Sequence, residues 1–199
     1  MKRNALALSF ALALISLPAA AATVGQAAPD FTASDLQGKA VRLADFRGKF
    51  VVLEWTNPEC PYVRRHYNSG NMPSLQKEVA AKDVVWLAIN STSQASGEFK
   101  TPAEMSKWLA GKGAAPRATV LDQDGKIGRL YQARTTPHMY LIYPQGRLVY
   151  AGAIDDQRWA STEETKAARN YVRAALGEAM SGKPVSVATT SPYGCSVKY

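Results

Sequence analysis

The two cysteines of this 199-residue sequence are the residues whose type and position most clearly indicate reactivity. Cys60 follows a nearly continuous apolar run at residues 50–55 and precedes Pro61, a residue that is tolerated in the first turn of a helix. The unpaired N–H groups and the dipole at a helix start favour a thiolate, which is the reactive form of cysteine. The pattern therefore predicts a reactive Cys60; a buried, inert cysteine is the alternative.

The neighbours of Cys60 act on a thiolate in opposite directions. Arg64, within the predicted helix, would stabilise the negative charge, whereas the carboxylate of Glu59 would destabilise it. The hydroxyl of Thr56 is placed either to hydrogen-bond the thiolate or to cap the turn before the helix. Arg64 and Thr56 are therefore candidate thiolate-stabilising residues.

Cys195 lies four residues before the C-terminal residue, beside Gly194, in a segment without helical periodicity. One role is that of a resolving thiol, which swings in on a flexible tail and attacks an oxidised Cys60. A static Cys60–Cys195 disulfide, a disulfide between two chains and a free thiol are the other possibilities. The residues themselves leave these roles open.

Residues 1–22 have the pattern of a cleaved secretory signal peptide: Lys2 and Arg3, an apolar run at 6–17, and alanines at 19–22. The apolar run is shorter than the ~20 residues that a spanning helix needs. We therefore expect a periplasmic or secreted protein with no membrane segment after cleavage. Such compartments are oxidising, which favours a disulfide between two thiols.

The charge of the chain does not indicate a nucleic-acid site. The formal net charge is +8, and loss of Lys2 and Arg3 with the signal peptide lowers it to +6. The remaining positive residues are dispersed, which is typical of a solvated surface. No metal site is predicted either, because His66 and His138 lack a second cysteine near Cys60.

The order of elements predicts a single α/β domain at residues 23–182, followed by a C-terminal tail at 183–199. Alternating strands and helices favour right-handed crossovers and a parallel core, and a closing hairpin adds antiparallel strands. The expected fold is a mixed central sheet with flanking helices and an N-terminal β-hairpin. The expected segments are a hairpin at 31–43, strands at 50–55, 84–90, 119–121, 138–143 and 147–151, and helices at 62–67, 72–81, 101–112, 126–132 and 162–180.

This arrangement resembles the thioredoxin fold, and more narrowly the redoxin, or peroxiredoxin-like, branch of the alkyl hydroperoxide reductase and thiol-specific antioxidant superfamily. The resemblance is carried by residues 28–31, 45–49 and 55–60, and by Thr136-Pro137 followed by 139–142. It covers roughly residues 25–180. It implies that Pro137 is cis and faces Cys60, and that the backbone of Thr136 pairs with a bound substrate.

The chain also departs from the patterns of that superfamily. Val63 stands where thioredoxins have the second cysteine of Cys-x-x-Cys, so a local dithiol exchange is excluded. Thr56 lies four residues before Cys60, whereas typical peroxiredoxins have three. Arg134 is close to the position of the family's peroxide-activating arginine, but its register is shifted. We retain it as a third candidate thiolate-stabilising residue.

The sequence thus predicts an exported thiol oxidoreductase that acts through Cys60, with Cys195 as the resolving thiol. The resemblance implies a peroxide or a protein thiol or disulfide as substrate, a thiol protein as electron donor, and no cofactor. The alternative is a non-catalytic periplasmic binding or structural protein with a static Cys60–Cys195 disulfide. The oligomeric state stays open.

Overall fold

A computed structural model describes residues 21–199, so the predicted signal peptide lies outside the described residues except for its last two. Strand β3 (Val51–Trp55) is the middle strand of a five-stranded sheet, and all five of its residues are buried. The apolar run that precedes Cys60 is therefore a central strand covered on both faces. Among the described residues, no helix is long and apolar enough to cross a membrane.

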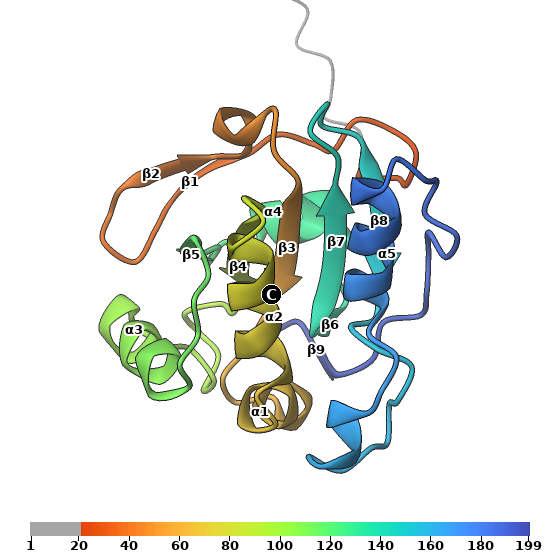
Figure 1. Ribbon diagram of the computed structural model, residues 1–199. Helices are drawn as coiled ribbons and strands as arrows, with labels where there is room; N and C mark the ends of the chain where they lie inside the picture. The colour runs from red at the N-terminus through yellow and green to blue at the C-terminus, as the bar shows by residue number, and fades with distance from the viewer. Residues whose placement is uncertain (1–20) are drawn as a thin grey trace, which may run out of the picture.

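The sheet is mixed, as predicted (Figure 1). Its strand order is β5-β4-β3-β7-β8. The pairs β3–β4 and β4–β5 are parallel, whereas β3–β7 and β7–β8 are antiparallel. The other strands of the sheet are β4 (Val85–Asn90), β5 (Ala118–Leu121), β7 (His138–Ile142) and β8 (Leu148–Gly152).

The predicted N-terminal hairpin is present. Strands β1 (Thr32–Ser34) and β2 (Ala40–Arg42) pair antiparallel. A short 3-10 helix, η1 (Leu43–Phe46), links the hairpin to the turn before β3.

The helices cover both faces of the sheet. Two helices, α2 (Asn71–Ala80) and α5 (Tyr171–Met180), lie on one face, and the short α4 (Lys126–Leu130) lies behind the sheet (Figure 1). Alternate residues of β3 enter different cores: Val52 packs on the α2 and α5 side, whereas Leu53 packs on the α4 side. The remaining helices are α1 (Pro61–Asn68) and α3 (Pro102–Gly111).

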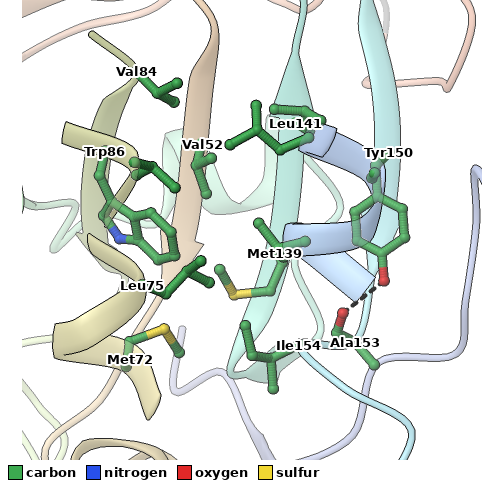
Figure 2. Packing of buried hydrophobic residues seen from close by; sticks show 14 of the residues in the cluster. Val52, Met72, Leu75, Val84, Trp86, Met139, Leu141, Tyr150, Ala153 and Ile154 are labelled. Atoms are coloured by element: carbon green, nitrogen blue, oxygen red, sulfur yellow. Dashed lines mark hydrogen bonds between the residues drawn. The ribbon is translucent and has the colours of Figure 1, made fainter. Parts of the chain in front are cut away.

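The core on the α2 side is tightly filled. Figure 2 shows Met72 and Leu75 of α2 near Trp86 of β4, with Met139 of β7 close by. These four side chains are 0–1% exposed. The packing fixes α2 on the sheet, and α1 precedes α2 directly at the end of the sheet where β3 terminates.

The predicted helix at 162–180 is wrong in its first half. Its N-terminal capping pair forms, since Ser161 N donates to Glu164 Oε2 at 2.7 Å, but only a 3-10 turn, η2 (Glu164–Lys166), follows. Helix α5 starts anew because the side chain of Asn170 accepts from Arg173 N at 2.9 Å as its N-cap. An isolated antiparallel bridge joins Asp155 to Asn170 and closes the intervening loop just before α5.

The expected free tail is also wrong. Residues Cys195–Ser196 form strand β9, which pairs antiparallel with β6 (Thr135–Thr136). Both short strands lie at the end of the sheet where β3 ends and β7 begins (Figure 1). The C-terminal segment is therefore docked on the domain.

A buried carboxyl lies in the central strand below the start of α1. Glu54 is fully buried, and it accepts hydrogen bonds from Tyr67 (2.9 Å), Trp86 (2.8 Å) and Gln76 (3.2 Å). Burial raises the pKa of Glu54 from 4.5 to about 7, against the opposing effect of these donors. The three donors tie α1, α2 and β4 to the middle of the sheet.

We predict that Glu54 makes the free energy of unfolding depend on pH. Because the folded pKa lies above the unfolded one, the native state binds more protons between pH 4.5 and 7, and stability falls as pH rises through this window. The loss is on the order of 3 kcal/mol. Glu54→Gln should remove it.

Urea unfolding at a series of pH values measures this effect. From pH 4.5 to pH 7, we expect the free energy of unfolding of the wild type to fall relative to that of Glu54→Gln. Parallel pH profiles for the two proteins would contradict the prediction. Glu78→Gln is the matched control, because the carboxyl of Glu78 is partly exposed and paired with Lys82 and Arg173.

Candidate active site

Cys60 is the N-cap of α1 and follows β3 by a short turn. Its backbone is extended, and Pro61 fills the first helical position, as the sequence predicted. The residue is only 1% exposed. The first turn of α1 presents unpaired N–H groups and the positive end of its dipole at this position.

The loop before β7 faces Cys60. The Thr136–Pro137 peptide bond is cis, which confirms the prediction. The thiol of Cys60 donates a hydrogen bond to the carbonyl oxygen of Thr136, with a distance of 3.0 Å from Sγ to O. The structure thus brings together Cys60, Thr136 and Pro137 at the end of the sheet.

Cys195 reaches the same place from the C-terminal segment. It is the partner of Thr136 in the β6–β9 pair, and both cysteines are free thiols. Burial, together with the hydrogen bond and charge of the adjacent Cys60, raises the pKa of Cys195 to about 12. The two sulfurs are therefore neighbours although 134 residues separate them in the chain.

Gly194 permits the close approach of the two strands. Its φ is +140°, and an added Cβ would overlap the carbonyl oxygen of Thr136 and lie 2.7 Å from the carbonyl carbon. Any larger residue would push the C-terminal strand off the cis-proline loop. Gly194 is thus required by contact with the same carbonyl group that binds Cys60.

Tyr193 anchors the C-terminal segment before β9. Its hydroxyl donates to Asp155 and accepts from Arg65 at 3.1 Å. It also lies 3.1 Å from His66 Nε2. Asn71 donates to His66 Nδ1 at 3.0 Å, so Nε2 carries the proton and donates to Tyr193. Burial lowers the pKa of His66 to about 3, which keeps this imidazole neutral.

A second set of contacts anchors the segment after β9. Val197 N donates to Arg134 O at 3.1 Å, and Ser93 N donates to Lys198 O at 2.7 Å. The hydroxyl of Tyr199 donates to Ala133 O at 2.7 Å. Cys195 is therefore held between two anchored stretches, and no swing of a free tail is needed to bring it to Cys60.

Three of the predicted residues are placed away from the sulfurs. Arg64 donates to Pro58 O at 2.7 Å and pairs with Glu59, whose carboxylate also binds Lys100 at 2.7 Å. The Arg134 side chain is exposed and lines a cavity together with His138 and Tyr131. Thr56 is buried, and within residues 21–199 no hydrogen bond joins its hydroxyl to Cys60. A role of these residues in stabilising a thiolate remains a prediction.

Sequence reasoning missed Tyr193 and Gly194 as parts of the site. The sequence held one signal, since Gly194 and Cys195 are adjacent in a segment that contains two tyrosines. Their partners lie in α1 and in the turns after β8 and before β7. Such contacts over long sequence separation are not visible in a local pattern.

Comparison with known proteins places this chain in a family. The model of the AhpC/TSA family matches residues 24–151, which is more than half of the chain. This chain belongs to the AhpC/TSA family. The redoxin relationship that the sequence resemblance indicated is confirmed.

One curated relative is the thiol-disulfide oxidoreductase ResA of Geobacillus thermodenitrificans, which is 33% identical over 135 residues. The match covers 64% of this chain and 68% of the relative. This AhpC/TSA protein thus spans about two thirds of the length of the curated relatives it matches. At the level of class, the expected thiol-dependent oxidoreductase is confirmed.

Two solved structures confirm the thioredoxin-like fold. An uncharacterised conserved protein from Geobacillus kaustophilus superposes with a TM-score of 0.77 at 26% identity, covering 89% of this chain and 92% of its own. A putative thiol:disulfide interchange protein DsbE from Chlorobium tepidum has a TM-score of 0.53 at 26% identity, covering 65% of this chain and 84% of its own.

We predict that mild oxidation joins Cys60 and Cys195 within one chain. The two thiols are held side by side in the reduced protein, so bond formation needs no large rearrangement. Titration of free thiols should fall from two per chain to none, with no dimer on a non-reducing gel. Cys60→Ser and Cys195→Ser should each keep one thiol. A disulfide-linked dimer as the main product would contradict the prediction.

Proposed function

We propose that this protein is an exported thiol-disulfide oxidoreductase, with Cys60 as the nucleophile and Cys195 as the resolving thiol of the same chain. The observation that carries the proposal is the pairing of Cys195 with Thr136, whose carbonyl oxygen binds the Cys60 thiol. Export is supported by the signal-peptide pattern at residues 1–22. The names of the ResA and DsbE relatives support the reaction class.

The reaction consists of two thiol–disulfide exchanges. The Cys60 thiolate attacks one sulfur of a substrate disulfide, which leaves a mixed disulfide on Cys60 and a thiolate on the substrate. Cys195, after losing its proton, attacks the Cys60 sulfur and releases the second substrate thiolate. Two electrons have passed from the protein to the substrate. The substrate disulfide is reduced to two thiols, and Cys60 and Cys195 are oxidised to a disulfide. A thiol protein as electron donor would return the pair to the reduced form.

Protein disulfides fit the site better than peroxides. Activation of a peroxide needs hydrogen-bond donors aimed at the reacting oxygens. The two expected donors, Thr56 and Arg134, make no hydrogen bond to Cys60 in the described part of the chain. The backbone at Thr136 instead accommodates an extended strand, as its pairing with Cys195 shows. We therefore favour disulfide exchange over peroxidase activity.

We predict distinct outcomes for the two cysteine variants in a turnover assay with a disulfide-containing protein and a dithiol reductant. Cys60→Ser should reduce turnover by about 100-fold or more, because it removes the nucleophile. Cys195→Ser should leave a mixed disulfide between Cys60 and the substrate, detectable by mass spectrometry. Ser181→Ala, an exposed change at the end of α5, should turn over like the wild type.

The same assay separates the alternatives. Efficient consumption of hydrogen peroxide, with a sulfenic acid trapped on Cys60 in Cys195→Ser, would replace disulfide exchange by peroxidase activity. No turnover of either substrate, together with a Cys60–Cys195 reduction potential below about −300 mV, would indicate a static structural disulfide.

A further inference from the structure

The two sulfurs of the site differ in their access to solvent. Cys60 is 1% exposed, whereas Cys195 is only partly buried. In a Cys-x-x-Cys motif, both thiols lie in the first turn of the same helix. Here the second thiol comes from a separate strand that lies over the cis-proline loop. Cys195 is therefore the sulfur of the pair that a partner outside the protein can reach.

The covering segment at residues 191–199 fits closely. Gly194 lies directly on the Thr136–Pro137 peptide, since a Cβ there would overlap the Thr136 carbonyl oxygen and approach Pro137 N to 3.2 Å. The ring of Tyr193 packs 5.8 Å from the ring of Tyr62, in the first turn of the helix that Cys60 caps. A glutathionyl or peptidyl group can therefore reach Cys60 only after these contacts open.

We propose that, while segment 191–199 is docked, external thiols exchange with the Cys60–Cys195 pair through Cys195, and that Cys60 becomes accessible only when this segment lifts. The inference rests on the proposed function and assigns the point of entry of reducing equivalents. An external thiolate attacks the Cys195 sulfur of the disulfide. The new bond joins the external sulfur to Cys195, and the electron pair of the broken bond leaves on Cys60.

The second half of the reaction balances in the same way. A second external thiol, as its thiolate, attacks the external sulfur of the mixed disulfide and releases Cys195, which takes a proton from water. The net reaction reduces the protein disulfide by two electrons and oxidises two external thiols to a disulfide. Cys60 suits the leaving role because it sits at the start of α1, where the unpaired N–H groups favour negative charge.

Tyr193 controls how readily the segment lifts. Its hydroxyl is buried with Asp155, His66 and Arg65, and two of these partners belong to α1. Lifting the segment breaks all three contacts and leaves buried polar groups without partners. Tyr193 is therefore a positioning residue, which acts on the site through the placement of Cys195.

The test uses the oxidised full-length mature protein and reduced glutathione. Samples are quenched with acid after a series of short times, and peptide mapping by mass spectrometry locates the glutathionyl group. We expect the label on Cys195 to exceed that on Cys60 by about 10-fold or more, because access to Cys60 requires the hydrogen bonds of the segment to break. Equal labelling, or an excess on Cys60, would overturn the inference.

Two variants displace the segment without changing either cysteine. Gly194→Ala introduces the overlap with Thr136, and Tyr193→Phe removes the buried hydroxyl. Each should raise the ratio of label on Cys60 to label on Cys195 by about 10-fold. The controls are Gly177→Ala, where the added methyl group meets nothing within 4 Å, and Tyr143→Phe, whose hydroxyl is exposed. Both controls should label like the wild type.

The result is separable from that of the proposed function. Unchanged labelling in folded Gly194→Ala and Tyr193→Phe would mean that the segment does not direct exchange, and the inference would be wrong. A protein that turns over disulfides but carries glutathione on Cys60 contradicts this inference alone. A protein that forms the Cys60–Cys195 disulfide but turns over no substrate contradicts the proposed function.

Discussion

The antiparallel pairing of β9 with β6 is the contact on which the whole site depends. It places Cys195 opposite Thr136, whose carbonyl oxygen also accepts the hydrogen bond from Cys60. The backbone of one residue therefore positions both thiols. The same pairing leaves no space for a side chain at Gly194 and buries Cys60. Two residues of strand are a weak element by themselves, so the pairing persists only because the chain on either side of β9 is anchored.

Helix α1 links these anchors to the core of the domain. Its N-cap is Cys60, and Arg65 and His66 near its C-terminal end hold Tyr193. Its last turn carries Tyr67, which donates to the buried Glu54 in the central strand. Arg65 also donates to the carbonyl oxygens of Arg158 and Ala160 in the loop after β8. A shift of this one helix would thus move Cys60, the anchor of Cys195 and the loop together.

Local sequence patterns predicted the elements that carry their own signal. The apolar run before Cys60 is a central strand, and the expected helix at 101–112 is α3, which starts at a capping box of Thr101 and Glu104. The cis form of Pro137 was implied by the family resemblance and is confirmed. The patterns failed where a contact between distant segments decides the structure. Asn170 interrupts the expected last helix because it pairs with Asp155, and the C-terminal segment docks through single hydrogen bonds without any apolar periodicity. Neither effect is encoded within a window of neighbouring residues.

The absence of a second cysteine at Val63 is thus compensated by tertiary structure and not by a local motif. Bringing two thiols together across 134 residues is entropically costly in a flexible chain. Here the cost is met by docking of the segment in the reduced state, before any disulfide forms. Disulfide formation then resembles the reaction of two preoriented groups. Cys195, supplied in this way, is the more exposed of the two thiols, whereas Cys60 is buried. If external thiols exchange through Cys195, as proposed, the position of the second cysteine in the chain decides which sulfur faces a redox partner.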